Sequence, residues 1–521
     1  MRAAAAPPKG HIPLPQAGCL AALAATLVGC NLPTGGPASP TAEPIPSSAT
    51  VAIAPPTPSL PPTLPDPTAP SPPTSTPLPR QAGFPILEPP GTLFLYTTRS
   101  GDTLPALALR FGVEAPQILA EAPLPAAGYL PTGLVVRIPN LLEAVTPGGE
   151  VLPDSEVIYS PAAADFDVGA FVAATNGYLS RYTETMEDET VLSGADIVQR
   201  VAEENSINPR LLLALLEFRS GYVYGVPQDA DARTYPLGFS VPDRPGLYQE
   251  LSVACSQLAR AYYGWRQGTL IETRPADGGS VRWNPTLNAG SVAVLHVFAL
   301  LAGTDGWLEQ VLGPPSFGEL YASMFGEPHT RAIEALLPTD LTQPDLELPF
   351  AAGEGWSLTA GPHPAWTAGT PRGALDLSPI TTEEPCAASF RWVTSSAPGV
   401  IARARHNAVA LDLDGDGSEA TGWVLLYYHV AGAGMIAENS RVEVGDRLGH
   451  PSCEGGRSTG KHVHVARKFN GEWLAADGPA PFVLSGWRAV ADARNYYGTL
   501  VRGAEVVTSD SSGQRGSTIV R

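Results

Sequence analysis

The sequence predicts a multidomain protein with a small βααβ domain, a mostly α-helical middle domain and an antiparallel all-β C-terminal domain. First, a chain of 521 residues is long enough for about three folded domains. Second, apolar residues recur at helical spacing in GADIVQRVAEENSINPRLLLALLEFRSGYV, which spans 194–223. Third, the last part of the chain alternates short apolar runs with Gly-rich turns, as strands joined by turns do.

Residues 1–30 predict a secretion signal. The apolar run from Cys19 to Gly29 follows Arg2 and Lys9, and it is shorter than the roughly 20 residues that a membrane-spanning helix needs. Its end, Leu-Val-Gly-Cys, resembles a bacterial lipobox, and this implies cleavage before Cys30 and a lipid on that thiol. The alternative is an ordinary secretory signal. Both predict an extracytoplasmic protein, and the lipid on Cys30 would be its only attachment to the membrane.

Residues 31–90 predict a disordered tether. Pro, Thr, Ser and Ala dominate this stretch and charged residues are almost absent. Such a composition cannot bury a core and favours extended polyproline conformations. At the other end of the chain, residues 503–521 contain the polar run SDSSGQRGST, and we expect this tail to be disordered as well.

Residues 91–142 predict a small domain of two strands and two helices. The run Ser-Gly-Asp-Thr at 100–103 places capping residues directly before an apolar-periodic segment. The segment resembles a LysM module in Gly101, Asp102, Leu104, Phe111, Gly112 and the closing Val-Arg-Ile-Pro. The resemblance implies binding of glycans that contain N-acetylglucosamine, with Gly101, Asp102 and Thr103 as candidate contacts. The alternative is a small structural domain without a ligand.

Residues 155–345 predict a helical domain in which two helices meet at Ser206–Pro209. Its opening resembles a lysozyme-like transglycosylase, whose catalytic Glu directly precedes a Ser-Gly pair. Here Arg219 stands in that place, and Glu217 lies about 200° around the helix. We therefore expect a non-catalytic scaffold or substrate-positioning domain, with a glycan-cleaving enzyme as the alternative. The lone Cys255 is expected to be a buried core thiol.

Five side chains in the C-terminal domain, 346–500, suggest a metal site. His363 and Asp376 come first, His429 ends an apolar run, and His462 and His464 stand in GRSTGKHVHVAR. On a strand, alternate side chains leave the same face, so the last two histidines would point into one site. Imidazole and carboxylate are the ligands of open, catalytic zinc sites. The pattern favours a zinc hydrolase, although a His-x-His pair by itself often has no function.

Residues 345–490 resemble the lysostaphin-like and beta-lytic zinc endopeptidases of bacterial cell walls. The family pattern is an early His and Asp, a strand that ends in Tyr-x-His, and a Gly-Ser-Thr-Gly-x-His-x-His stretch. In most members the first His stands four residues before the Asp, where this chain has Arg372. The beta-lytic branch instead uses a Gly-Pro-His turn farther upstream, and Gly361-Pro362-His363 stands thirteen residues before Asp376.

The resemblance implies the role of each residue. His363, Asp376 and His464 would bind Zn²⁺, while His429 and His462 would be the two catalytic histidines that do not bind the metal. We assign His462 as general base and His429 as oxyanion partner, although the sequence does not fix which is which. The implied activity is hydrolysis of peptide bonds in peptidoglycan. The alternative is a degenerate peptidoglycan-binding protein that recruits or activates another wall hydrolase.

An acidic turn and a cysteine pair complete the predictions for this domain. Asp412, Asp414 and Asp416 resemble the start of a calcium loop, but Trp423 stands where an EF-hand needs Glu, so we favour a solvated hairpin turn over a calcium site. Cys386 and Cys453 are the only cysteines here, and two such residues usually pair in an oxidising compartment. The alternative is two free thiols.

The net charge limits the partners of the protein. A formal charge of −19 argues against nucleic acid or an anionic membrane surface. It also disfavours tight electrostatic binding to anionic wall polymers. Recognition of peptidoglycan is therefore expected to depend on contacts with its glycan and peptide parts.

Overall fold

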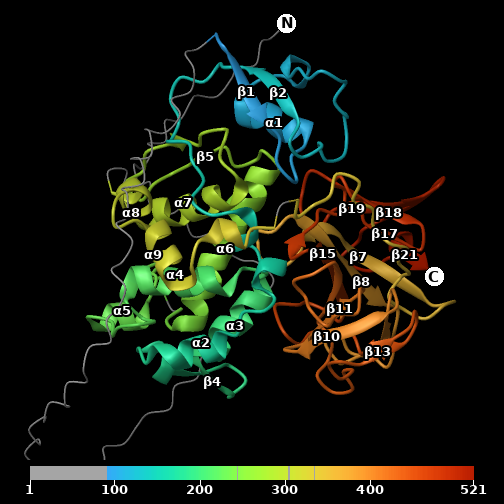
Figure 1. The fold of residues 1–521 in the computed structure, drawn as a ribbon. Coiled ribbons are helices and arrows are strands. Elements are labelled where there is room, and N and C mark those ends of the chain that lie inside the picture. Colours follow the sequence, from blue (N-terminus) through green and yellow to red (C-terminus); the bar gives the residue numbers. More distant parts are fainter. Residues whose placement is uncertain (1–90, 243, 303–305, 334) are drawn as a thin grey trace, which may run out of the picture.

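The computed structural model describes residues 91–242, 244–302, 306–333 and 335–521. The signal peptide predicted at 1–30, with Cys30, and the tether predicted at 31–90 lie outside these residues. The described chain forms a small N-terminal module, a helical region below it and a β-rich region beside both (Figure 1). No helix in the described ranges combines the length and the apolar character that crossing a bilayer requires.

The N-terminal module is a two-stranded sheet covered by one helix. Strands β1 (Leu93–Thr97) and β2 (Val135–Pro139) pair in antiparallel fashion, and α1 (Leu104–Phe111) packs against them. Thr103 caps the start of α1, and Gly112 ends it in the left-handed conformation, with φ of 66°. The expected second helix is only a 3₁₀ turn, η1 (Ala115–Gln117). Prolines that follow this turn in the sequence lack the N–H groups that a longer helix would need.

The middle region is only partly helical, which corrects the expectation of a mostly helical domain. Its described helices are α2 (Val168–Thr175), α3 (Gly194–Asn205), α4 (Pro209–Ser220), α5 (Ala230–Thr234), α6 (Leu247–Arg266), α7 (Ala289–Leu301), α8 (Trp307–Leu312) and α9 (Phe317–Phe325). Its described residues also form two hairpins and four 3₁₀ helices: β3 (Thr183–Thr185) with β4 (Val191–Ser193), β5 (Glu272–Thr273) with β6 (Val281–Arg282), η2 (Asp154–Glu156), η3 (Pro161–Ala163), η4 (Leu179–Arg181) and η5 (Pro328–Thr330). Helical periodicity in 194–223 predicts α3 and α4 well, but it does not reveal the long Pro- and Gly-containing connections elsewhere.

The C-terminal region is antiparallel and all-β, as predicted. Its largest sheet runs β13-β10-β11-β12-β15-β8-β7-β21, and β16 pairs with β15. The strands of this sheet are β7 (Gly355–Pro364), β8 (Arg372–Pro379), β10 (Gly399–Arg405), β11 (Ala408–Asp412), β12 (Trp423–Tyr428), β13 (Arg441–Val442), β15 (Val463–Phe469), β16 (Glu472–Trp473) and β21 (Thr518–Val520). Two smaller sheets contain β9 (Val393–Thr394), β14 (Arg447–Gly449), β17 (Val483–Leu484), β18 (Trp487–Ala491), β19 (Gly498–Arg502) and β20 (Glu505–Thr508).

The expectation of a disordered tail at 503–521 is wrong. Strand β20 pairs with β19, η6 (Arg515–Ser517) follows, and β21 adds to the edge of the large sheet beside β7. Ile519 lies opposite Trp356 and is buried in the core of the β-rich region. The apolar residues around the polar run therefore hold the tail in place.

The two faces of the large sheet contact different parts of the protein. Ala374 and Ala466 belong to the core that they share with the helices, whereas their strand neighbours Leu375 and Val465 belong to the core of the β-rich region. Such alternation is the rule for a sheet that is buried on both faces. Alanine on the helical side leaves room for helices to pack close to the sheet. The helical region thus covers one face of the large sheet (Figure 1).

A buried arginine joins all three parts of the protein. The guanidinium of Arg266, at the end of α6, lies 2.6 Å from the Glu472 carboxylate of β16 and 3.1 Å from that of Asp154. It also donates a hydrogen bond to the carbonyl of Ser100 in the N-terminal module. Tyr262 donates a hydrogen bond of 2.7 Å to the same Glu472 carboxylate. Burial raises the pKa of Glu472, so this carboxylate depends on these partners to stay charged.

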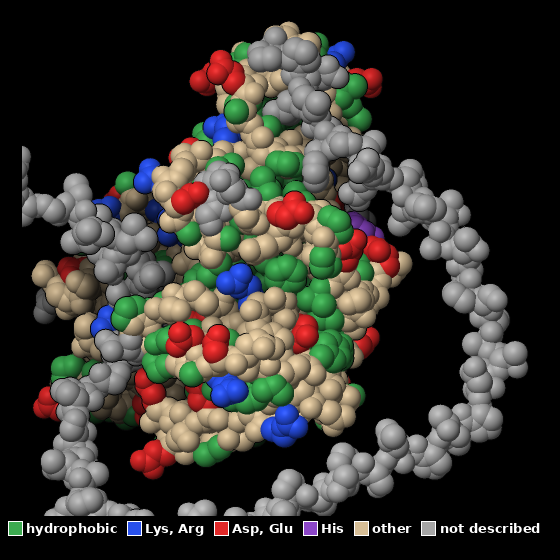
Figure 2. Space-filling view, turned by 90° about the vertical axis from the view of Figure 1, so that its left-hand side faces the viewer, with side chains coloured by type: hydrophobic (Ala, Val, Ile, Leu, Met, Phe, Trp, Pro, Cys, Tyr) green, Lys and Arg blue, Asp and Glu red, His purple; other side chains and the backbone are tan. Residues whose placement is uncertain are grey.

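The exposed side of the helical region has no dominant charge. Figure 2 shows that Lys and Arg side chains are scattered singly among Asp and Glu side chains on this face. The described residues of this face therefore form no continuous basic surface, which agrees with the net charge of −19.

We expect Glu472→Ala to lower the free energy of unfolding by about 3–5 kcal/mol, because it leaves the Arg266 guanidinium buried with one partner fewer. Urea unfolding of the purified full chain measures the change. Glu505→Ala is the matched control: its ion pair with Arg502 is exposed and contributes about 0–1 kcal/mol. Equal losses in the two variants would contradict the role of the buried junction.

Candidate metal centre

Neighbouring strands bring the predicted metal ligands together. His464 in β15 lies opposite Asp376 in β8, and His363 near the end of β7 lies opposite Ala374 in β8. Irregular pairing between β7 and β8 around residues 358–364 shifts His363 toward the other two side chains. The three residues point from the face of the sheet that the helical region covers.

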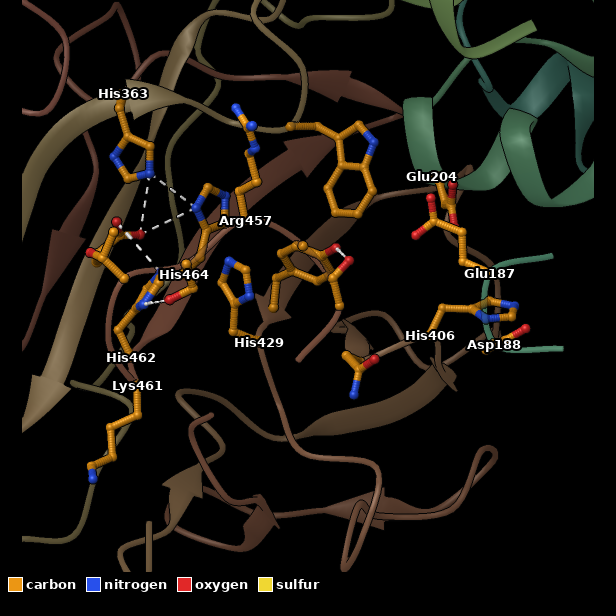
Figure 3. Close-up of a pocket in the computed structure, with 18 of the residues that line it drawn as sticks. Glu187, Asp188, Glu204, His363, His406, His429, Arg457, Lys461, His462 and His464 are labelled. Atoms are coloured by element: carbon orange, nitrogen blue, oxygen red, sulfur yellow. Dashed lines mark hydrogen bonds and ion pairs between the residues drawn. The ribbon is translucent and has the colours of Figure 1, made fainter. Parts of the chain in front are cut away.

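Three ligand atoms converge within hydrogen-bond distance of one another. His363 Nε2 lies 3.0 Å from His464 Nδ1 and 3.2 Å from Asp376 Oδ1, and His464 Nδ1 lies 3.3 Å from the same carboxylate oxygen. The side chains of His363 and His464 are 1% and 3% exposed, so water screens these contacts little. Figure 3 shows the His363 and His464 side chains pointing toward one another.

The outer ring nitrogens fix the tautomers of both histidines. His363 Nδ1 lies 2.9 Å from the Gly361 carbonyl, and His464 Nε2 lies 2.9 Å from the Ala365 carbonyl. A carbonyl only accepts hydrogen bonds, so each outer nitrogen carries the proton and each inner nitrogen of a neutral ring presents a lone pair. Asp376 Oδ1 is buried and has no hydrogen-bond partner. Two imidazole nitrogens and one carboxylate oxygen, all short of a donor, suit Zn²⁺ and leave its fourth position open.

The charges in the cluster hold Asp376 in its ionised form. Burial raises the pKa of the Asp376 carboxyl, but the neighbouring His363 and His462 side chains lower it more, to well below its usual range. Burial also lowers the pKa of His464. The pKa of His363 is lowered by burial, yet the neighbouring Asp376 carboxylate raises it more.

The two predicted catalytic histidines lie beside this cluster. His462 Nε2 is 3.7 Å from Asp376 Oδ2, while its Nδ1 is 2.8 Å from the Gly460 carbonyl. His429 follows β12 in a left-handed conformation, with φ of 64°, and its Nδ1 is 2.8 Å from the Glu454 carbonyl. Burial and the nearby His462 lower the pKa of His429 to about 3. In the rings of His429 and His462, Nε2 is therefore the nitrogen that is available to exchange or share a proton.

The cluster opens into a large cavity between the helical and β-rich regions. Its volume is about 1600 Å³, and its walls include Trp366 from the connection between β7 and β8, Tyr428 from β12 and Tyr248 from α6. Tyr496 also lines the cavity, where its ring stacks on His363 with centroids 4.6 Å apart. No sequence motif singles out Tyr496, because it reaches the site from a distant loop. Arg372, which stands four residues before Asp376, donates a hydrogen bond to the Asp492 carbonyl.

The three residues predicted to contact glycan instead contact other residues of the protein. Asp102 is 1% exposed, and its carboxylate pairs with Arg110 at 2.7 Å and accepts a hydrogen bond from Tyr96. Thr103 caps α1, and a Cβ on Gly101 would collide with the Arg266 guanidinium. Asp102 and Thr103 thus stabilise the N-terminal module. Gly101, which has no Cβ, allows the module to lie close to α6.

The candidate acid of the helical region also has a structural role. Glu217 Oε2 accepts hydrogen bonds of 2.9 Å from the backbone N–H groups of Val223 and Tyr224, just after α4 ends. Arg219 donates a hydrogen bond of 3.0 Å to the Leu237 carbonyl. Cys255 is a buried free thiol.

The acidic turn forms the connection between β11 and β12. Ligand oxygens of Asp412, Asp414 and Asp416 lie within 4.8 Å of one another. Asp412 accepts hydrogen bonds from the backbone N–H groups of Asp414 and Gly417, which explains the turn without a cation. Burial and the adjacent Asp412 carboxylate raise the pKa of Asp414 to about 6.

A disulfide anchors the loop that leads to the histidine strand. Cys386 and Cys453 are bonded, with Cα atoms 5.2 Å apart and a sequence separation of 67. Glu454, the next residue, supplies the carbonyl that holds His429. The bridge therefore ties a distant segment to the backbone that orients one histidine of the site.

Comparisons with known proteins relate both large regions to proteases. Residues 150–339 match the family model described as LasA, N-terminal domain. The chain is 27% identical over 375 residues to Protease LasA of Pseudomonas aeruginosa, which covers 66% of this chain and 81% of that protein. It is also 28% identical over 158 residues to beta-lytic metalloendopeptidase of Lysobacter enzymogenes. This match covers 29% of this chain and 82% of that protein. These similarities support a metallopeptidase.

Two solved structures resemble smaller parts of the chain. The M23 metalloprotease pseudoalterin is 22% identical and covers 35% of this chain and 99% of its own, with a TM-score of 0.28. The catalytic domain of the antimicrobial peptidase lysostaphin from Staphylococcus simulans is 19% identical, with a TM-score of 0.17. The match covers 24% of this chain and 95% of the lysostaphin domain.

We expect the purified protein to bind one Zn²⁺ per chain and His464→Ala to weaken that binding on the order of 100-fold or more, because one of three ligands is lost. Titration against a competing chelator measures the affinity. His450→Ala is the matched control, since the His450 ring bonds to the Arg391 carbonyl outside the cluster. Equal zinc affinity in wild type and His464→Ala would show that the cluster is not the metal site.

Replacing both Cys386 and Cys453 by Ser is expected to lower the free energy of unfolding by about 4 kcal/mol, because a long loop is no longer closed in the unfolded chain. Thermal unfolding without reductant measures the loss. Wild type treated with dithiothreitol should match the double variant, which itself should not respond to the reductant. A double variant as stable as oxidised wild type would contradict this prediction.

Proposed function

We propose that this chain is an extracytoplasmic zinc metalloendopeptidase that hydrolyses peptide bonds of peptidoglycan. One observation carries the proposal: His363 Nε2, Asp376 Oδ1 and His464 Nδ1 lie within 3.3 Å of one another. The similarity to Protease LasA and to beta-lytic metalloendopeptidase supports the same reaction. The proposed setting in the cell envelope depends on the signal peptide and Cys30, and these are predictions from the sequence.

The side chains of the site have complementary tasks in this reaction. Zinc held by His363, Asp376 and His464 would activate a water molecule as nucleophile and polarise the carbonyl of the scissile bond. His462, next to Asp376 and with a free inner nitrogen, is suited to accept the proton of that water and to pass it to the leaving amine. His429 is suited to stabilise the negative charge that develops on the carbonyl oxygen.

The aromatic walls of the cavity have a separate task. Trp366, Tyr428 and Tyr496 offer apolar surface on which a peptide chain can lie beside the metal centre. Burial of His363 and His464 keeps the two ligand rings away from bulk water. We infer that the N-terminal module assists by binding glycan, as its resemblance to LysM modules implies, although Asp102 is too buried to contact a ligand directly.

The alternative of a non-catalytic binding protein agrees less well with the site. A protein that only binds peptidoglycan would not need five metal-binding or catalytic side chains around one cavity. It would also not need backbone carbonyls to orient each of the four histidines. Measurement of hydrolysis separates the two functions.

We expect His462→Ala to lower the rate of wall hydrolysis by about 10²–10⁴-fold while zinc stays bound, because the variant loses a proton acceptor and keeps the three ligands. Loss of turbidity of purified cell walls and the appearance of new amino groups report the reaction. His450→Ala again serves as the control and should retain full activity.

Two outcomes would contradict the proposal. New reducing sugar ends without new amino groups would show that glycan bonds are cleaved. A wild-type protein that contains zinc and leaves purified walls intact would favour the non-catalytic binding protein.

A further inference from the structure

We propose that Arg457 binds a carboxylate of the substrate and positions the peptide across the metal centre. This inference depends on the proposed peptidase function and narrows its substrate to peptides that carry a free carboxylate close to the scissile bond.

Arg457 lies in the same cavity as the metal centre. It belongs to the Gly-rich loop between β14 and β15, five residues before His462. The cavity that His363, His464 and His462 line is also lined by Arg457. Figure 3 shows the Arg457 side chain on the side of the cavity where these histidines lie. A substrate bound at the histidines can therefore also contact this guanidinium.

The loop that carries Arg457 is anchored on both sides. On one side, the Gly455 carbonyl accepts a hydrogen bond from the Tyr428 hydroxyl, and Glu454 Oε2 accepts one of 2.7 Å from Asn407 Nδ2. On the other side, the Ser458 hydroxyl donates a hydrogen bond of 2.7 Å to the Gly460 carbonyl. The Cys386–Cys453 disulfide adds a covalent link four residues upstream. A guanidinium on so fixed a backbone loses less freedom when it binds a ligand.

The guanidinium of Arg457 has no protein partner among the described residues. Some other arginines of the β-rich region form ion pairs, such as Arg403 with Glu419 and Arg405 with Glu438 and Glu203. Acidic residues outnumber basic ones by 51 to 32 in this chain, so an arginine in a cavity has many possible partners. The planar guanidinium matches a carboxylate with two parallel hydrogen bonds, which makes an external carboxylate its best ligand.

The opposite wall of the cavity favours one orientation of the substrate. Glu187 and Asp188, from the β3–β4 hairpin, lie on the far side of the cavity from the metal centre (Figure 3). A substrate carboxylate would be repelled by these side chains and attracted by Arg457. A Zn²⁺ ion beside Asp376 would add net positive charge on the Arg457 side. Arg200 and Arg244 also line the cavity, but Arg200 is already paired with Glu204 at 2.8 Å. The cavity thus favours substrates whose carboxylate faces the metal centre.

The test compares two forms of the same purified cell walls. One form is untreated, and in the other the free carboxylates are converted to amides with a carbodiimide and ammonia. Initial rates of turbidity loss at several wall concentrations give an apparent KM and kcat for wild type, Arg457→Gln and Arg457→Lys. The matched control is Arg447→Gln, because Arg447 lies over the Trp392 ring and does not line the cavity.

We expect wild type to show an apparent KM about tenfold or more higher on amidated walls, since one charge-assisted pair is lost. Arg457→Gln should show this higher KM on both forms with kcat nearly unchanged, and Arg457→Lys should lie between. Arg447→Gln should behave like wild type.

Three outcomes overturn the inference. If Arg457→Gln still distinguishes the two wall forms as wild type does, another group binds the carboxylate, and Arg244→Gln and Arg200→Gln then test the two other arginines that line the cavity. If wild type digests both forms equally, no carboxylate is recognised, although the peptidase function stands. If wild type digests neither form, the proposed function fails and the inference fails with it.

Discussion

The site depends on electrostatic repulsion among three electron-rich atoms. Backbone carbonyls hold the outer nitrogens of His363 and His464, so the inner nitrogens of neutral rings face each other and the buried Asp376 oxygen without a proton between them. Such a cluster is unfavourable in a low-dielectric interior unless a cation occupies it. The folded sheet fixes these positions through strand pairing, and it therefore provides a preorganised site for a divalent cation.

The architecture around this cluster follows from strand alternation. Side chains of β8 and β15 alternate between a core shared with the helices and a core internal to the β-rich region. The candidate ligands point to the helical side, so the helices form one wall of the cavity beside them. The junction of Arg266 with Glu472 and Ser100 extends this packing to the N-terminal module. The face of the sheet that carries the cluster, the helical region and the module are thus parts of one packed structure.

Residues whose spacing follows the repeat of a strand or a helix can be identified from the sequence. Residues that reach the site only through tertiary contacts cannot. His462 and His464 are recognisable because a strand repeats every two residues, and α3 and α4 are recognisable from helical periodicity. Tyr496 and Arg457 have no such periodic signal, because loops bring them to the cavity. The ordered tail escaped prediction because Ile519 gains its stability from β7, which is more than 150 residues away in the sequence. Asp102 is buried in contact with Arg110 and Tyr96, and a sequence motif does not reveal such contacts.

The most direct measurement is an anomalous difference map from crystals of the purified protein, with data collected on both sides of the zinc absorption edge. The account predicts one strong peak at about 2.0–2.2 Å from His363 Nε2, Asp376 Oδ1 and His464 Nδ1. A map with no peak there, or with its only peak at the Asp412–Asp416 turn, would contradict the account.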